Sequence, residues 1–224
     1  MNSMSAELIQ TPRLDLCLIA ADDLIQLFES PENFSLPIQA YYKNTHRVLL
    51  DNSGPLRWRV PQVKQDPTLN KWFVRFIVLR EAKEIIGSIS FHGEPDSNGM
   101  IEVGLEVVTA FQNQGYASEA LLGMWQWVST QQGVKTLRYT VSPSNGPSQR
   151  IIEKFGFVHM GVQIDEDDGP EDIFELPTSD FRRNFPRLCE PVEFQASKNS
   201  RIARPGQDQE RAKTRSQQRP TDWN

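Results

Sequence analysis

The chain is poor in the residues that build metal centres and disulfide frameworks. Among 224 residues there are two cysteines, Cys17 and Cys189, and three histidines, His46, His92 and His159. The cysteines could pair, but the spacing of these residues matches neither a disulfide framework nor a zinc-ligand pattern. We therefore expect two free thiols in a reducing, cytoplasmic compartment, and no bound metal.

Long apolar runs are also missing. No stretch approaches the roughly 20 apolar residues of a membrane span. Residues 1–10 lack the basic region and apolar core that mark a secretory signal. Hydrophobic residues make up 38% of the chain and charged residues 24%, as in a globular protein with some polar length. These absences argue against a membrane partner.

The net charge of −5 is unevenly distributed. Residues 198–224 hold seven Lys or Arg and three Asp or Glu, which leaves −9 on the rest of the chain. A basic tail can bind nucleic acid, but stacking on single strands needs aromatic residues among the charges, and this tail offers Trp223 alone. We expect a disordered polar tail over 186–224, no nucleic-acid partner, and a body that attracts cations.

Strand-like and helix-like segments alternate between these ends. Period-2 patterns predict strands over residues 13–19, 72–79, 84–91, 100–108, 136–142, 157–164 and 171–176. Helical patterns and caps predict helices over residues 21–29, 115–132, 147–155 and 178–184, with Gly133 as a C-terminal cap of the second. The pattern of residues 31–70 predicts two or three short helices broken by prolines, one of them around residues 41–50. We expect this segment to form part of a substrate cleft.

Together these elements predict one α/β (α+β) domain over residues 10–185. Its sheet is expected to be mixed and mostly antiparallel, with helices packed on it. Residues 1–9 are expected to form a flexible N-terminus.

The most informative motif lies between a strand and a helix, at Gln-Asn-Gln-Gly-Tyr-Ala-Ser, residues 112–118. A compact turn at a helix start can direct several free backbone N–H groups at one anion, with the helix dipole adding positive potential. Small residues at Gly115 and Ala117 let the backbone approach a ligand closely. A plain helix start would look similar, so this motif alone does not separate a phosphate site from a capped helix.

Two common phosphate motifs are excluded by the details of this turn. The three-glycine dinucleotide fingerprint and its early βαβ unit are absent, and so is the Gly-Lys-Ser/Thr of a Walker loop.

A second ordered run follows one helix and one strand later. It reads Asn-Gly-Pro-Ser-Gln-Arg-Ile-Ile-Glu-Lys-Phe-Gly-Phe over residues 145–157. Routine helix capping would explain Asn145 or Ser148, but not the whole run.

With these two segments the chain resembles the GNAT acetyltransferase superfamily. The first is similar to its Arg/Gln-x-x-Gly-x-Gly/Ala pyrophosphate loop, and the second to its Asn-x-x-Ser-x-Arg segment ending in Gly-Phe. Residues 11–14, 86–89 and 101–104 resemble the branch that includes the acetyltransferases of ribosomal-protein N-termini (alanine or serine). The resemblance covers about residues 10–178 and leaves out the tail.

The resemblance implies acetyl-CoA as co-substrate. The strand before the loop is expected to carry a bulge and to splay from its neighbour, so that the pantetheine arm bonds to strand backbone. Asn113 stands where glycine is common, and asparagine tolerates the left-handed backbone that this requires. The expected cofactor-binding residues are Leu105, Glu106, Val107, Gln112, Asn113, Gln114, Gly115, Tyr116, Ala117, Ser118 and Asn145.

The resemblance also implies direct attack of an amine on the thioester, with a backbone N–H of the splayed strand stabilising the oxyanion. Glu102 is the first candidate base, since its side chain should point away from those of Ile101 and Val103. His92 is the alternative base. Ser148 is the candidate to protonate the leaving thiolate, because Ile152 stands where some relatives have a tyrosine.

The expected acceptor is a protein N-terminus or a small amine, and the expected enzyme is a monomer or a homodimer. The alternative is a non-catalytic acyl-CoA-binding regulatory module with the same fold.

Overall fold

The structure is a computed structural model that describes residues 8–33, 41–165 and 169–186, all within one compact unit, Met1–Pro191. The strands are β1 (Ile9–Gln10), β2 (Leu14–Leu18), β3 (Arg75–Leu79), β4 (Glu84–Phe91), β5 (Met100–Val107), β6 (Thr136–Val141), β7 (Val158–Asp165) and β8 (Gly169–Pro177). The α-helices are α1 (Ala21–Glu29), α2 (Leu56–Gln65), α3 (Tyr116–Val128), α4 (Gly146–Phe155) and α5 (Thr178–Asn184). Short 3₁₀ helices cover Pro31–Asn33, Pro67–Trp72 and Thr109–Phe111.

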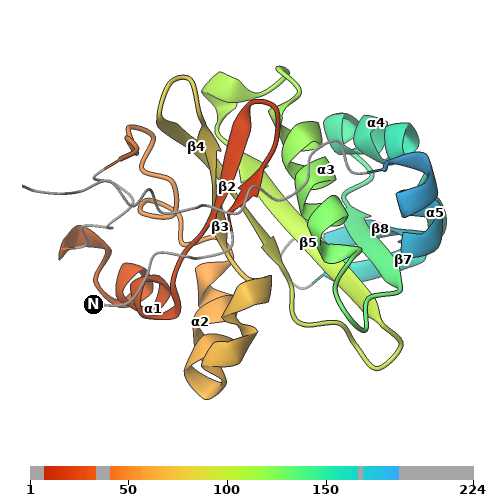
Figure 1. The fold of residues 1–224 in the computed structure, drawn as a ribbon, viewed down its shortest axis with the longest axis horizontal. Helices are drawn as coiled ribbons and strands as arrows, with labels where there is room; N and C mark the ends of the chain where they lie inside the picture. Colours follow the sequence, from red (N-terminus) through yellow and green to blue (C-terminus); the bar gives the residue numbers. More distant parts are fainter. Residues whose placement is uncertain (1–7, 34–40, 166–168, 187–224) are drawn as a thin grey trace, which may run out of the picture. The chain divides into compact units, whose positions relative to one another are not determined.

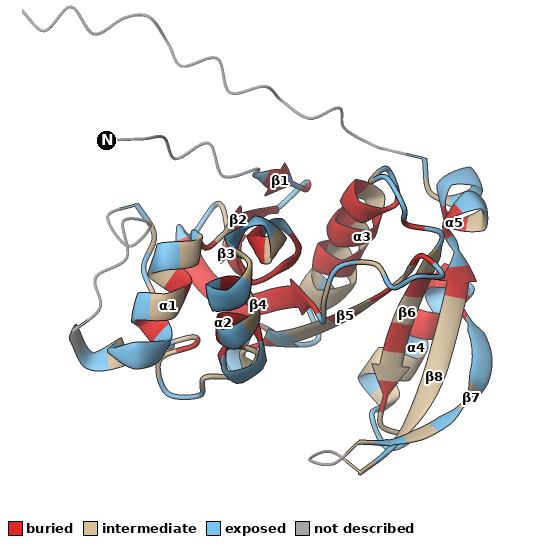
Figure 2. Ribbon diagram, turned by 90° about the horizontal axis from the view of Figure 1, so that it is seen from below, coloured by how far each residue is buried: buried red, intermediate tan, exposed pale blue. Residues whose placement is uncertain are grey.

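The described strands form one sheet in the order β1-β2-β3-β4-β5-β6-β8-β7. Neighbouring strands are antiparallel except for β5 and β6, which run parallel. This confirms the expected mixed, mostly antiparallel sheet with flanking helices. Helices α1 and α2 lie on one side of strands β2–β4 and α3 lies on the other, as Figure 1 and Figure 2 show.

The core between the sheet and helices α3 to α5 centres on Trp125, which is fully buried. Its indole contacts the rings of Phe155, Phe157 and Phe181, with centroids 4.8–6.1 Å apart. These rings come from α4, from the residue before β7, and from α5. Burying so much aromatic surface at one point holds the C-terminal end of α4 against the sheet, where Trp125 also contacts Tyr139 of β6.

A glycine sets the spacing of β4 and β5. A Cβ added to Gly87 would lie 2.1 Å from the carbonyl oxygen of Glu106. No other residue type fits there without moving β5, the strand that the family resemblance implies lies beside the co-substrate.

The segment between α1 and β3 differs most from expectation. The helix around residues 41–50 is wrong: this stretch forms turns, with positive φ at Arg47 and Leu49. The side chain of Asn44 accepts from the Val48 N–H and donates to the Val48 carbonyl, at 2.9 and 3.1 Å, so it replaces helical bonds locally. Residues 34–40 lie outside the described part of the chain.

Proline does not break the next helix. Pro61 lies inside α2, where Leu56, Val60 and Val63 are buried against the core. Tertiary packing therefore outweighs the lost backbone hydrogen bond.

Several predicted boundaries also shift. The strand predicted from residue 72 begins at Arg75, after a 3₁₀ turn. Helix α3 ends at Val128, with Ser129 as its C-cap, so Gly133 lies in a later turn and does not cap it. Ile9 was expected in the flexible N-terminus, but it lies in the short strand β1 and pairs with Leu16 of β2. The tail beyond Pro186, with Cys189, lies outside the described residues.

The expected bulge is not in β5. The pairing of β5 with β4 runs without a register shift from Val103 to Val107. The irregularity lies one strand away, where Ile77 and Val78 of β3 pair with Gly87 and Ile85, so that Ile86 of β4 is the extra residue.

None of the described helices is long and apolar enough to cross a bilayer.

Candidate active site

The sheet opens between β5 and β6. The two strands pair only at Met100–Thr136, Ile101–Leu137 and Glu102–Arg138, and no pairing follows. This is the splay expected for the domain.

The backbone groups that face this gap follow from the register of β4 and β5. The His92 N–H donates to the Glu102 carbonyl, so even-numbered residues of β5 bond to β4. The odd-numbered residues Val103, Leu105 and Val107 therefore turn their N–H and C=O groups toward the gap. Glu106, also expected to bind the co-substrate, directs its backbone to β4 and exposes its side chain.

The loop before α3 has the backbone of an anion site. Asn113 has φ of 59° and Gly115 has φ of 81°, so the chain passes twice through the left-handed region within three residues. Within the described structure, the N–H groups of residues 113–118 donate to no protein acceptor. These N–H groups are free to donate to an anion at the positive end of α3, so the loop fits a pyrophosphate group.

Side chains of the loop hold its shape. Gln112 donates through Nε2 to the Val107 carbonyl at 2.8 Å, and Gln114 donates to the Ala110 carbonyl at 3.2 Å. Arg13 donates to the Gln114 carbonyl at 3.1 Å and lies 4.4 Å from the Tyr116 ring centre. Hence Gln112 and Gln114 already have backbone partners.

Lys154 brings a cation to the same loop. Its Nζ donates to the Ser118 hydroxyl at 2.9 Å, which links α4 to the first turn of α3. The sequence motif contained this lysine, but spacing alone did not place it beside the loop.

At the start of α4, Asn145 is the N-cap, as the capping interpretation predicted. Its Oδ1 accepts from the Ser148 N–H at 3.1 Å, so its amide nitrogen remains for a ligand. The Ser148 hydroxyl lies 3.2 Å from the phenol oxygen of Tyr139, a residue of β6. Ile152, in contrast, is a buried core residue.

Tyr139 is a candidate that the sequence reasoning missed. It is 5% exposed, and burial raises its pKa, opposed by the hydrogen bond with Ser148. The phenol therefore keeps its proton at neutral pH. The alternation of residues 136–141 could have shown Tyr139 on a buried face, but not its contact with α4.

On the opposite face of the gap, the two candidate bases meet. The Glu102 carboxylate accepts from the Thr140 hydroxyl at 2.6 Å and lies 3.4 Å from Nδ1 of His92. Its side chain is 14% exposed, and Ile101 and Val103 point into the core, as predicted. Glu102 and His92 therefore form one group, although the sequence offered them as alternatives.

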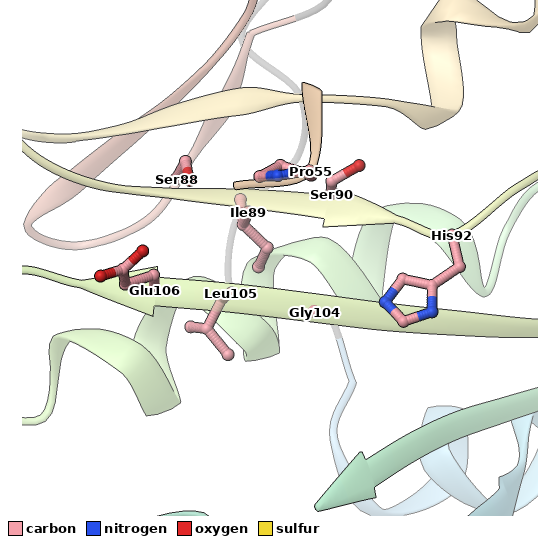
Figure 3. Close-up of a pocket in the computed structure, with 8 residues that line it drawn as sticks. All are labelled: Pro55, Ser88, Ile89, Ser90, His92, Gly104, Leu105 and Glu106. Atoms are coloured by element: carbon pink, nitrogen blue, oxygen red, sulfur yellow. The ribbon is translucent and has the colours of Figure 1, made fainter. Parts of the chain in front are cut away.

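Burial lowers the pKa of His92, and the charge of Arg59 lowers it further, while Glu102 and Asp165 act to raise it. The ring is accordingly neutral at pH 7. It also lies close to the strand: a Cβ on Gly104 would come within 3.0 Å of its Nε2. Figure 3 shows the imidazole turned toward Gly104.

A cleft of about 640 Å³ opens over this group. It is bounded by residues of α2 and the segment before it, by Glu102, His92 and Thr140, and by the β7–β8 hairpin. A smaller pocket, drawn in Figure 3, continues along β4 and β5 past Ser90 and Leu105. No cluster of His, Cys, Asp or Glu in the described ranges has the geometry to hold a metal ion.

Comparisons with known proteins agree with this geometry. Residues 13–158 match the family described as acetyltransferase (GNAT) domain. The chain is 34% identical over 82 residues to the uncharacterized N-acetyltransferase YjdG of Bacillus subtilis, covering 37% of this chain and about half, 49%, of that relative. It is 24% identical to the uncharacterized N-acetyltransferase YoaA of the same organism, over 69% of this chain and 85% of YoaA.

The fold is shared with solved structures. The ribosomal-protein-S5-alanine acetyltransferase of Vibrio fischeri superposes with a TM-score of 0.55 at 16% identity, over 78% of this chain and 98% of that one. At this identity the likeness shows the fold.

Proposed function

Since this chain belongs to the acetyltransferase (GNAT) family and is an N-acetyltransferase, we propose that it acetylates a primary amine by direct attack within a ternary complex. One observation carries the proposal. The sheet opens directly after Glu102, with free loop amides and Tyr139 on one side of the opening and the Glu102–His92 group on the other. The two substrates would therefore approach from opposite faces and meet between β5 and β6.

On the donor side, the amides of residues 113–118 would hold the pyrophosphate of acetyl-CoA. The gap-facing backbone of Leu105 and the N–H of Val107, whose carbonyl accepts from Gln112, would bond the pantetheine arm. The free amide nitrogen of Asn145 would lie at the end of this arm. Bound acetyl-CoA supplies the thioester carbonyl that the amine attacks.

On the acceptor side, Glu102 would take the proton from the incoming ammonium group. The Thr140 hydroxyl fixes one of its oxygens, so the other can face the amine. A gap-facing N–H, of Val103 or Leu105, would stabilise the negative charge that develops on the carbonyl oxygen. Ser148 and Tyr139 would donate a hydrogen bond or a proton to the departing sulfur.

The proposed acceptor is a protein N-terminus or a small amine. The cleft between α2 and the β7–β8 hairpin is where this amine would bind. The carboxylate of Glu102 at the floor of this cleft favours binding of a positively charged ammonium group.

The test measures acetyl-CoA binding by calorimetry and free-thiol release with a panel of amines and N-terminal peptides. We expect binding and acceptor-dependent release. Binding without release for every acceptor would favour the non-catalytic module, and the absence of binding would contradict the proposal.

Two glycines provide a matched test of the loop. Gly115 and Gly133 both have positive φ, so alanine strains each backbone by about 1 kcal/mol. Only Gly115 lies in the anion loop. Gly115→Ala should weaken acetyl-CoA binding about tenfold, and Gly133→Ala should leave it unchanged. If Gly115→Ala and Gly133→Ala bound acetyl-CoA with equal affinity, the loop would not be part of the co-substrate site.

A further inference from the structure

One buried cation in the acceptor cleft forms no ion pair with any residue that the structure describes. Arg59 of α2 is 6% exposed and lines the same cleft as Glu102 and His92. Within the described residues, no carboxylate forms an ion pair with its guanidinium.

The hydrogen bonds of Arg59 are incomplete as well. Its Nη1 donates to the Gln62 side chain at 3.3 Å, and its buried Nε has no hydrogen-bond partner in the described structure. Its guanidinium carbon lies 5.9 Å from the centre of the Phe73 ring. A buried guanidinium with open donors is costly unless a ligand completes it.

The group nevertheless keeps its charge. Burial lowers the pKa of Arg59 to about 10, partly offset by Glu102. At neutral pH the cleft therefore holds a fixed cation near the carboxylate of Glu102. A guanidinium presents several N–H donors in one plane, which suits a carboxylate or phosphate oxygen pair.

We propose that the acceptor is a small amine that also carries an acidic group, a carboxylate or a phosphate, and that Arg59 binds this group while the amine meets Glu102. This proposal rests on the function proposed above and adds the acceptor class. Arg59 is then a specificity-determining residue. A peptide N-terminus without a nearby acid, or a polyamine, would place no anion on this guanidinium.

The first experiment uses the wild-type protein and thiol release. Glycine, β-alanine, 4-aminobutyrate and 6-aminohexanoate are each compared with their amides, and phosphoethanolamine with ethanolamine. We expect kcat/KM at least tenfold higher for the acid-bearing member of the best pair. The carboxylate and phosphate arms show which acid fits. Equal or higher values for amides, putrescine or neutral peptides would overturn the proposal.

The second experiment uses Arg59→Gln. It should lower kcat/KM at least tenfold for the acid-bearing acceptor and less than twofold for its amide. The matched control is Lys64→Gln, which removes a charge from the exposed side of the same helix and should change neither value. An equal loss on acid and amide would mean that Arg59 acts through Glu102 or through the fold, and would contradict acceptor recognition.

A binding measurement separates this inference from the proposed function. The N-acetylated acids and N-acetylated amides of the same series are titrated by calorimetry, without turnover. Tighter binding of acids that is lost in Arg59→Gln would support the Arg59 site even if no amine released thiol. Thiol release with no preference for acids would retain the acetyltransferase and reject the Arg59 site. Equal binding of acids and amides also counts against it.

Discussion

Arg13 and Glu119 form an ion pair that ties the anion loop to the first part of the sheet. Arg13 Nε lies 2.6 Å from Glu119 Oε2, and the Arg13 N–H and the Thr11 hydroxyl both donate to Oε1. The same arginine holds the Gln114 carbonyl. The Thr-Pro-Arg-Leu start and the loop, about a hundred residues apart, are therefore one structural unit.

Glu119→Gln should loosen this unit. We expect a loss of about 1–3 kcal/mol in the free energy of unfolding at pH 7, because charged hydrogen bonds are lost, and weaker acetyl-CoA binding. Urea unfolding and calorimetry measure the two effects. Glu153→Gln, at an exposed position of α4, is the control and should change neither.

The same residue predicts a pH dependence of stability. Burial acts to raise the pKa of Glu119, but the hydrogen bonds from Thr11 and Arg13 outweigh it, so the pKa is lowered below 4.5. Its stabilising contribution is then present above pH 4.5 and is lost as pH falls through the lowered folded-state pKa. The difference in stability between wild type and Glu119→Gln should shrink below pH 4.5. A constant difference down to pH 3 would contradict this.

Ala117→Pro should remove one loop amide with little effect on folding. The Ala117 N–H has no protein acceptor in the described structure, and α4 already accepts a proline at the equivalent second position, Pro147. We expect acetyl-CoA affinity to fall about tenfold, measured by calorimetry. Ala117→Ser keeps the N–H and should bind normally. Tight binding by the proline variant would exclude this amide from the pyrophosphate site.

The strands and the two motifs were predictable because they depend on local patterns. The alternating pattern of β5 correctly predicted that Glu102 points away from Ile101 and Val103. The asparagine at residue 113 correctly indicated a left-handed position in the loop, whereas the positive φ of Gly115 was not predicted. The contact of His92 with Glu102 depends on the β4–β5 register, which alternation alone does not fix.

Tertiary contacts explain what the sequence reasoning missed. Arg59 is in a helix that its sequence disfavours through Pro61, so nothing local indicated that it would be buried. Asn44 competes for backbone groups that the expected helix around residues 41–50 would need. Tyr139 and Ser148 meet because Trp125 positions α4 against β6.

Glu102→Gln should remove the proposed base and keep the fold. The glutamine can still accept from Thr140, but it cannot take a proton. We expect kcat to fall at least about 100-fold, with acetyl-CoA affinity unchanged. Thr140→Val removes only the hydrogen bond to the carboxylate, and it should lower kcat about tenfold.

A pH profile distinguishes Glu102 from His92. Since the pKa of His92 is lowered from 6.5, a histidine base would give an acid limb of kcat/KM with its midpoint below pH 6.5. Activity would be lost as pH falls through that value. We expect His92→Gln to retain most activity at pH 8. If His92→Gln were inactive at pH 8 and Glu102→Gln were active, the histidine would be the base.

Tyr139→Phe tests protonation of the leaving thiolate. The substitution removes the hydroxyl that lies 3.2 Å from Ser148 and keeps the ring that packs on Trp125. If the pair donates to the sulfur, Tyr139→Phe and Ser148→Ala should each lower kcat about tenfold or more. The double variant should lower kcat little more than either single variant, because paired groups act as a unit. Tyr41→Phe is the matched control and should keep full activity, since Tyr41 is exposed and lines neither pocket. Full activity in Tyr139→Phe with a large loss in Ser148→Ala would assign the proton to the serine, because only the residue that reaches the sulfur should be sensitive on its own.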